Sequence, residues 1–418
     1  MGDLPKPLVD VDGQPLLKRQ LRKLEEAGFD EAVVLVNHQA SFIRDFLSSA
    51  DLTISTRVID DGEPRGTAGA VLAILDALEP RFLVVYGDTL FNVDFDRFER
   101  FHRNSSAAAS LLLHPNDHPE DSDLVELDEA RRIVGFHPYP HPKDSWLPNL
   151  VNAALYFVEN KALRPYCGLA SPQDFAKDLF PRMVADGQTL AGYSSSEYIK
   201  DLGTPVRLDK ATLALRQGVV DRASYSVAQR AVFIDRDGTV NRENGFIRRA
   251  EDLEVFPFVG PALKRLNDRE YRAVLVTNQP VIARGEASMA DLRRIHGRLD
   301  AEVAFSKAYF DAQYICPHHP DAGYPGEVAK LKVKCDCRKP RPGLVLQAMA
   351  DMNIDPSRSW LVGDSTADFG AAAAAGVRSI GVKTGQGGQD GKYPFGPSMW
   401  ASDFSAAVEL ILREEEIG

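Results

Sequence analysis

Two carboxylates stand one residue apart where an apolar stretch of the sequence ends. Asp235 and Asp237 follow the apolar residues 231–234, in the sequence AVFIDRDGT. Carboxylates at the end of a buried strand are costly to desolvate unless a cation or a reaction requires them. One carboxylate can attack the phosphorus of a phosphate monoester, and a second can protonate the leaving alkoxide and then deprotonate water. Because alternate residues of a strand point the same way, the pair can serve one phosphoryl-transfer site.

Three further motifs follow in order and supply the other groups that such a reaction needs. Thr277 lies near the end of RAVLVTN, Lys339 lies in CRKP, and Asp364 ends SWLVGD. Mg²⁺ takes oxygen ligands and keeps several waters, so one or two carboxylates, a backbone carbonyl and a substrate phosphate suffice to bind it. Thr277 and Lys339 would hold the phosphoryl oxygens as charge builds. Each motif alone also occurs as an ordinary turn or helix cap, but the order and the strand context favour a single site.

Three of the four cysteines cluster late in the sequence. Cys316, Cys335 and Cys337 form a CxH…CxC pattern with His318. In a reducing compartment such a cluster binds metal more often than it forms disulfides, and three thiolates with one imidazole complete a structural Zn²⁺ site. His319 is an alternative ligand to His318, and idle buried cysteines are the plain structural alternative. A zinc module that binds nucleic acid is disfavoured by the acidic chain and by the absence of a basic recognition helix.

Composition narrows the class of protein and its partners. The 418 residues suffice for two or three domains, and the formal net charge of −11 disfavours non-specific binding to nucleic acid or to anionic membranes. No apolar run approaches the ~20 residues that span a bilayer, and the N-terminus lacks a signal-peptide pattern. We therefore expect a cytoplasmic protein whose partners are small molecules. The sequence leaves the oligomeric state open.

Short apolar stretches alternate with segments of helical periodicity in both halves. The expected strands are 31–37, 81–88, 152–158, 231–235, 272–278 and 359–364, and the expected helices include 15–28, 205–217 and 260–271. This alternation predicts an α/β fold with two doubly wound, Rossmann-like domains, whose ligands bind at the carboxyl ends of the strands. A polar segment near residue 225 places one domain at 1–222 and the other at 229–418.

Residues 231 to about 386 resemble the haloacid-dehalogenase superfamily of phosphatases, on the four motifs described above. The resemblance implies that Asp235 is the nucleophile and Asp237 the general acid and base. It also implies that Mg²⁺ is held by Asp235, Asp364 and the backbone carbonyl of Asp237, with Asp368 in a supporting position. The second domain would then be a haloacid-dehalogenase fold that carries a small zinc loop.

The closer resemblance is to the zinc-bearing heptose bisphosphate phosphatases of that superfamily. It is carried by DRDGTVNRENGF, TNQPVIARG, CPHHP and CDCRKPRPG. It implies removal of the 7-phosphate of D-glycero-D-manno-heptose 1,7-bisphosphate in a pocket lined by Glu243, Asn244, Gly245, Phe246, Thr277, Asn278, Gln279, Pro280, Arg338 and Lys339. Pro280-Val281 stands where the family has Ser-Gly, which leaves the preferred sugar and anomer open. Histidinol-phosphate phosphatase belongs to the same branch and is the alternative.

Residues 4 to about 214 resemble sugar-1-phosphate nucleotidyltransferases. The motifs are LPKPLVDVDGQPLL, EPRGTAGAV, VVYGDT, NLVNAALYF and YIKDLGTP. The resemblance implies that Lys6 contacts phosphate, that Gly66 and Gly69 lie against the nucleotide, and that Asn152 contacts the sugar. It also implies that Asp88 and Asp201 are Mg²⁺ ligands. A nucleoside triphosphate would then be a further partner. Ordinary helix capping is the alternative role for the two aspartates.

Two departures separate this half from that family. The family opens with a strand and a glycine-rich GxGTR loop that cradles the triphosphate, and the sequence lacks both; FHPYPHP also replaces the expected Glu-Lys-Pro. Loss of the cradle predicts weaker stabilisation of the transferring phosphate, and loss of the strand predicts an open sheet edge. The half is thus either a catalytic domain truncated by a misplaced start or a non-catalytic binding or assembly module. If both domains are active, the phosphatase domain would make heptose 1-phosphate and the nucleotidyltransferase domain would convert it to an NDP-heptose.

Overall fold

The chain folds into two compact units in the computed structural model, which describes residues 5–37, 39–142, 145–169 and 172–417. Both units are α/β, as the sequence predicts. Unit 1 comprises Met1–His114, Val125–Pro138 and Asn152–Ser224, and unit 2 comprises Pro115–Leu124, Tyr139–Val151 and Tyr225–Gly418. Two short segments from the first half of the sequence therefore belong to unit 2.

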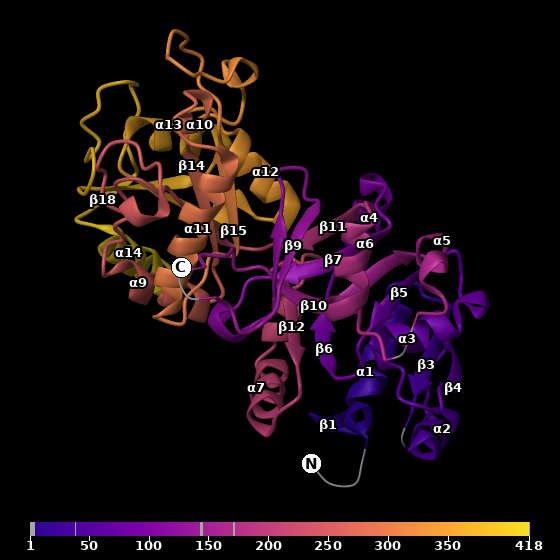
Figure 1. Ribbon diagram of the computed structural model, residues 1–418. Helices are drawn as coiled ribbons and strands as arrows, with labels where there is room; N and C mark the ends of the chain where they lie inside the picture. Colours follow the sequence, from indigo (N-terminus) through magenta and orange to yellow (C-terminus); the bar gives the residue numbers. More distant parts are fainter. Residues whose placement is uncertain (1–4, 38, 143–144, 170–171, 418) are drawn as a thin grey trace. The chain divides into compact units, whose positions relative to one another are not determined.

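Unit 2 is built on a six-stranded sheet with the order β15-β14-β13-β16-β17-β18 (Figure 1). Its strands are β13 (Ala231–Ile234), β14 (Arg272–Asn278), β15 (Ala312–Cys316), β16 (Trp360–Gly363), β17 (Arg378–Val382) and β18 (Met399–Ala401). All neighbouring strands run parallel. The chain starts in the middle with β13, builds outward to β15 and returns to β16 on the other side of β13. The carboxyl ends of β13 and β16 thus form the topological switch point where ligands bind in such sheets.

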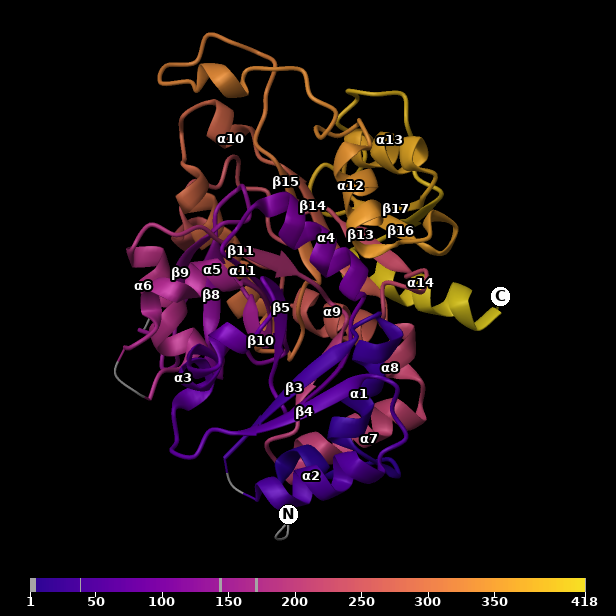
Figure 2. The ribbon, with the colours of Figure 1, turned by 90° about the vertical axis from the view of Figure 1, so that its right-hand side faces the viewer.

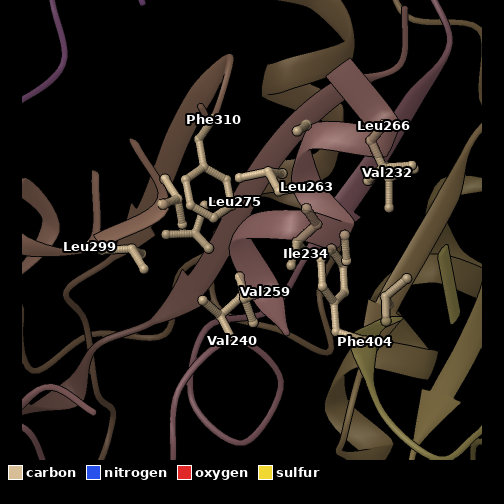
Figure 3. Packing of buried hydrophobic residues seen from close by; sticks show 14 of the residues in the cluster. Val232, Ile234, Val240, Val259, Leu263, Leu266, Leu275, Leu299, Phe310 and Phe404 are labelled. Atoms are coloured by element: carbon tan, nitrogen blue, oxygen red, sulfur yellow. The ribbon is translucent and has the colours of Figure 1, made fainter. Parts of the chain in front are cut away.

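Helices cover both faces of this sheet. They are α9 (Val259–Asp268), α10 (Pro280–Ala283), α11 (Met289–Ala304), α12 (Gly343–Met352), α13 (Thr366–Ala375) and α14 (Phe404–Ile417). Val232 and Ile234 of β13 pack with residues of α9, α11 and α14 (Figure 3), whereas Ala231 and Phe233 pack with residues of α12 and α13. Because alternate residues are buried on opposite faces, this strand is apolar without interruption.

Unit 1 holds a mixed sheet with the order β11-β7-β10-β8-β9, in which β5 also pairs with β10, and three two-stranded sheets. The strands of the mixed sheet are β5 (Arg81–Val85), β7 (Ala109–His114), β8 (Leu124–Leu127), β9 (Ile133–His137), β10 (Val151–Glu159) and β11 (Leu190–Ser194). The two-stranded sheets pair β1 (Asp10–Val11) with β2 (Gln14–Pro15), β3 (Glu31–Val36) with β4 (Ser55–Asp60), and β6 (Thr89–Asn92) with β12 (Tyr198–Asp201). β5 runs antiparallel to β10, so the sheet is not wholly parallel as the alternation of elements suggested.

The helices of unit 1 are α1 (Leu16–Glu26), α2 (Ala40–Ser49), α3 (Gly66–Ala73), α4 (Phe95–Ser105), α5 (Asn160–Leu163), α6 (Phe180–Ala185), α7 (Pro205–Arg216) and α8 (Val219–Arg222). The apolar stretches expected as strands form β3, β5, β10, β13, β14 and β16, and the three expected helices form α1, α7 and α9. Within the described ranges, no helix combines the length and the apolar character that crossing a bilayer requires.

An open edge runs through the sheets of unit 1. β3 and β4 form a separate parallel pair (Figure 2), and in the described part of the chain β5 hydrogen-bonds only to β10. Leu24 and Phe29 pack against the apolar cluster that Leu83 of β5 joins and also against the cluster that Val34 of β3 joins, so the two strands border connected apolar clusters without pairing. Their side chains are mostly half-buried, unlike those of β7. This agrees with the open edge that the sequence predicts.

Candidate active site

Three carboxylates gather at the switch point of unit 2. Asp235 follows β13, Asp364 follows β16, and Asp368 lies in the first turn of α13. All three are buried, and their oxygens lie within 4.8 Å of one another. Burial raises the pKa of Asp235 to about 7 despite the opposing charge of Lys339, and burial with repulsion from the other two carboxylates raises the pKa of Asp364 to about 9. An excess of buried negative charge and an oxygen-only donor set fit a divalent cation such as Mg²⁺.

Lys339 places a positive charge among these carboxylates. Its Nζ lies 2.6 Å from Oδ1 of Asp235 and 2.6 Å from Oδ1 of Asp368, and it donates to the carbonyl of Val276 at 2.8 Å. Burial opposes the charge, but the two carboxylates outweigh it and raise the pKa of Lys339. The amide of Asn278 donates to the carbonyl of Lys339 and accepts from its N–H, each at 3.1 Å. The ammonium is therefore charged and fixed in place.

Asp237 lies in the turn after β13 rather than in the strand itself. Gly238 adopts a φ of 82° in this turn, a backbone conformation that favours glycine. That carboxylate accepts from Arg236 Nη2 at 3.0 Å, Asn241 Nδ2 at 3.0 Å and Gln279 Nε2 at 2.8 Å. Burial alone would raise the pKa of Asp237, but Arg236 and these hydrogen bonds hold it below the ordinary value. The resting carboxylate is thus in the form that accepts a proton.

The loop after β17 completes the surroundings of Asp364. A Cβ atom on Gly238 would lie 2.2 Å from Oδ2 of Asp364, and one on Gly385 would lie 2.0 Å from it. The backbone N–H groups of Gln386 and Gly388 donate to Oδ2 and to the carbonyl of Asp364, each at 2.6 Å. Only glycine permits this close approach. Sequence reasoning missed this loop, although its TGQGG motif also follows a strand and offered the same signal as the other motifs.

Several residues expected to bind substrate lie next to this cluster. Thr277 is buried near the end of β14, where its hydroxyl accepts from Gln279 Nε2 at 2.9 Å. Glu243 accepts from the side-chain amide of Gln386 at 2.5 Å. The backbone N–H of Gln386 also donates to Asp364, so Gln386 links Glu243 to the carboxylate cluster. Asn244 instead reaches Glu254, at 3.4 Å.

The remaining residues expected in the pocket lie in the loop after β13, at the start of α10 and beside the cysteine cluster. Phe246 is 38% exposed, and the guanidinium of Arg284 lies 4.4 Å from the centroid of its ring. Gly245 adopts a φ of 75° in the same loop. Pro280 is the first residue of α10, a position where the missing N–H of proline leaves no hydrogen bond unmade. Arg338 donates to the carbonyl of His318 at 3.3 Å, which ties it to the cysteine cluster.

The three cysteines and His318 form a compact cluster. The Sγ–Sγ separations are 3.6, 3.2 and 3.1 Å, and Nδ1 of His318 lies 3.2 Å from Cys337 and 3.8 Å from Cys316. These lengths are close to the edges of a tetrahedron around Zn²⁺, about 3.5 Å for Zn–ligand bonds near 2.2 Å, and too long for a disulfide. Of the two candidate histidines, His318 lies in the cluster, whereas Nδ1 of His319 accepts from the Asp321 N–H at 3.2 Å.

In unit 1, several of the predicted residues come together around two strand ends. Lys6 begins a 3₁₀ turn whose Pro7 Cγ lies 3.2 Å from the position of a Cβ on Gly87, the residue before Asp88. The Asp88 carbonyl accepts from the Leu202 N–H at 2.8 Å, which brings Asp201 beside it. Asp201 also pairs with Arg207 at 2.5 Å.

The other predicted residues of unit 1 contact the protein's own backbone. A Cβ on Gly66 would lie 2.4 Å from the carbonyl oxygen of Gln173, and the N–H of Gly69 donates to the same oxygen at 3.2 Å. The side-chain oxygen of Asn152 accepts from the Ala154 N–H at 3.1 Å. The two glycines thus allow a close approach of neighbouring chain at the start of α3.

Comparison with known proteins supports both halves of the sequence interpretation. A family model described as "Nucleotidyl transferase" matches residues 2–218, just over half of the chain, and one described as "HAD-hydrolase-like" matches residues 336–407. The D-glycero-beta-D-manno-heptose-1,7-bisphosphate 7-phosphatase of Haemophilus ducreyi is 41% identical over 162 residues, which are 38% of this chain and 86% of that protein. The chain belongs to both families.

The chain is therefore a fusion of a nucleotidyltransferase domain with a phosphatase domain of the haloacid-dehalogenase type. A second relative of the phosphatase domain, the 7-phosphatase of Vibrio cholerae, is 40% identical over 161 residues, covering 38% of this chain and 84% of that protein. A solved D,D-heptose 1,7-bisphosphate phosphatase from B. bronchiseptica, complexed with magnesium and phosphate, is 31% identical and covers 44% of this chain and 99% of its own, with a TM-score of 0.40. HddC from Yersinia pseudotuberculosis is 22% identical and covers 51% and 91%, with a TM-score of 0.45.

Proposed function

We propose that the phosphatase domain removes the 7-phosphate of D-glycero-D-manno-heptose 1,7-bisphosphate in a Mg²⁺-dependent reaction, as one step of NDP-heptose biosynthesis. The observation that carries the proposal is the buried cluster of Asp235, Asp364, Asp368 and Lys339 at the sheet's switch point, in a chain whose relatives are named for this activity. The proposal places this domain at 229–418.

The proposed chemistry has two steps at one phosphorus atom. Asp235 attacks the phosphorus and forms an aspartyl phosphate, while the bond from phosphorus to the C7 oxygen breaks. Asp237 takes up a proton from solvent when the anionic ester binds, and gives it to the C7 oxygen as that bond breaks. Asp237 then takes a proton from water, which attacks the aspartyl phosphate and releases inorganic phosphate. Lys339 and Thr277 hold the phosphoryl oxygens as charge builds on them. The lowered pKa of Asp237 supports its role as base in the second step.

Mg²⁺ would be held by Asp235, Asp364 and the backbone carbonyl of Asp237. When bound, the ion would neutralise charge on the phosphate and the carboxylates, so that an anionic nucleophile can approach an anionic substrate. Asp368 is assigned to Lys339, with which it pairs at 2.6 Å, and it accepts from the Ser365 N–H at 3.0 Å in the capping box of α13.

The zinc loop and two neighbouring loops are proposed to bind the rest of the sugar phosphate. Zn²⁺ on Cys316, His318, Cys335 and Cys337 would fix the backbone that leads directly into Arg338. Arg338, Asn278 and Gln279, with Glu243, Asn244, Gly245 and Phe246, are the proposed substrate contacts. Residues 243–246 are exposed, unlike the buried carboxylates, which suits recognition of a soluble polar sugar.

The nucleotidyltransferase domain, proposed at 1–222, would use the heptose 1-phosphate that the phosphatase releases. Asp88 and Asp201 would hold Mg²⁺ and the nucleoside triphosphate, with Lys6 on phosphate, Gly66 and Gly69 facing the nucleotide, and Asn152 on the sugar. The alternative for this domain is a non-catalytic module for nucleotide binding or assembly. Both activities, and the reduced thiols of the zinc site, suit the cytoplasm.

The experiment that tests the proposal measures phosphate release from a panel of substrates with and without Mg²⁺. The panel contains both anomers of heptose 1,7-bisphosphate and histidinol phosphate, and Asp235→Asn is the control. Turnover of one heptose anomer, lost without Mg²⁺ and in the variant, supports the proposal. Turnover of histidinol phosphate alone would assign the alternative function.

A further inference from the structure

A chain of polar side chains runs from Asp237 away from the carboxylate cluster. Arg236 has no exposed surface, and its Nη2 donates to both oxygens of Asp237 and to Gln279 Oε1, each at 3.0 Å. Its Nη1 lies 3.2 Å from Nε2 of His296 on α11. Burial, reinforced by Arg236, lowers the pKa of His296 to about 3. The imidazole is therefore neutral, and its Nε2 accepts from the guanidinium.

The chain continues beyond His296 to the far side of α11. His296 hydrogen-bonds to the side chain of Gln313 on β15, and Nε2 of Gln313 donates to Oδ1 of Asp300 at 2.7 Å. Oδ2 of Asp300 accepts from the backbone N–H of Asn149 at 3.1 Å. His296 and Asp300 are both 5% exposed, so protein groups rather than water satisfy them. Each partner thus fixes the orientation of the next.

The outer end of the chain lies on the segment Tyr139–Val151, which belongs to unit 2. Asn149 exchanges two hydrogen bonds with the backbone of Asn116, of 3.1 and 2.7 Å. Nearby, a Cβ on Gly297 would lie 2.6 Å from the carbonyl oxygen of Trp146, so α11 needs glycine where this segment crosses it. The guanidinium of Arg298 lies 5.4 Å from the Trp146 ring centroid. The segment is therefore packed against α11 through several contacts.

We infer that His296, Gln313 and Asp300 are positioning residues for the general acid, and that Trp146 and Asn149 anchor them. A buried guanidinium with one carboxylate partner is stable in one orientation only if its other N–H groups also find acceptors. Gln279 and His296 supply those acceptors to Arg236. Loss of the His296 acceptor frees Arg236 to turn, and the Asp237 carboxylate turns with it. Residues matched by the nucleotidyltransferase family model thereby support the phosphatase site.

This inference rests on the proposed phosphatase activity and is tested with two kinds of ester in the full chain. A sugar phosphate has an alkoxide leaving group that needs the acid, whereas p-nitrophenolate leaves without a proton. We expect His296→Leu to lower kcat/KM for the sugar bisphosphate about tenfold and to leave kcat/KM for p-nitrophenyl phosphate within about twofold. His296→Gln, which keeps an acceptor, restores most of the loss. Asp300→Leu acts in the same direction by a smaller factor.

Leu299→Ala is the matched control, because Leu299 is fully buried on the same helix but lies in the apolar cluster. It reports the effect of destabilising α11 alone. Equal losses on both esters in His296→Leu, or no loss on either, would overturn the inference. Hydrolysis of p-nitrophenyl phosphate by the wild type without turnover of heptose bisphosphate would reject the proposed substrate instead. The same comparison then uses histidinol phosphate as the alkyl ester.

Discussion

The ammonium of Lys339 lies 2.6 Å from a carboxylate oxygen of Asp235, the residue proposed as nucleophile. The same ammonium lies 2.6 Å from a carboxylate oxygen of Asp368, so Lys339 shares its charge between the two carboxylates. One positive charge among three buried carboxylates leaves an imbalance that a divalent cation removes.

Replacement of Lys339 by methionine removes the only ammonium in the cluster while keeping the length of the side chain. We expect Lys339→Met to lower kcat about 100-fold or more, because the phosphoryl oxygens lose a fixed positive charge. The melting temperature in Mg²⁺-free buffer falls as well, since Asp235 and Asp368 become buried without a cation. Lys264→Met, on the exposed face of α9, is the control and leaves both values unchanged. Full activity in Lys339→Met would contradict the assigned role.

The cysteine cluster predicts one zinc per chain. Cys335→Ser removes a thiolate ligand, and we expect it to lose the bound zinc and to melt on the order of 10 °C lower, because a structural zinc stabilises the fold that holds it. Metal analysis and thermal melting check this prediction. Cys167→Ser, at the exposed cysteine outside the cluster, keeps the zinc and the wild-type melting temperature. A zinc-free wild type purified without chelators would refute the site.

Asp300 predicts a specific dependence of stability on pH. Burial raises its pKa from 3.8 to about 7, so the folded protein holds a proton that the unfolded chain releases. The stability that this group contributes is complete below about pH 4 and is lost as the pH rises through about 7. The side chain in Asp300→Asn cannot ionise. The melting temperature of this variant relative to that of the wild type therefore rises by a few degrees between about pH 5 and about pH 8. If the melting temperatures of the two proteins changed with pH by the same amount, Asp300 would not titrate as described.

Asp88 and Asp201 are the residues at which we expect unit 1 to bind a metal–nucleotide complex. We expect Mg²⁺–nucleoside triphosphate to bind the full chain at millimolar concentration and to bind at least about tenfold more weakly after Asp88→Asn. Calorimetric titration with each of the common triphosphates measures this. Asp209→Asn on α7 serves as a charge-matched control. Absence of binding by the wild type would leave the assembly role for this domain.

The parts of the site that follow strand ends were predictable from the sequence. Asp235, Thr277 and Asp364 each lie at or next to the end of an apolar stretch, and parallel strands bring their carboxyl ends to one edge. The cysteine spacing likewise indicated the cluster, although only the structure distinguishes His318 from His319.

Contacts between residues far apart in the sequence were not predictable. Asn149 donates to Asp300 across 151 positions, and no local pattern marks either residue. The two hydrogen bonds between the Asn278 side chain and the Lys339 backbone depend on the path of the zinc loop that separates these residues in the sequence. The turn that carries Asp237 replaced the expected strand, because its orientation depends on Arg236 and Gln279 rather than on strand periodicity.

The most direct test of the proposed function follows heptose 1,7-bisphosphate by phosphorus NMR in the presence of the full chain and Mg²⁺. The predicted result is loss of the C7 phosphomonoester signal, growth of inorganic phosphate and retention of the C1 phosphate, with no change in the Asp235→Asn protein. Loss of the C1 signal, or an unchanged spectrum under conditions in which the protein hydrolyses histidinol phosphate, would contradict it.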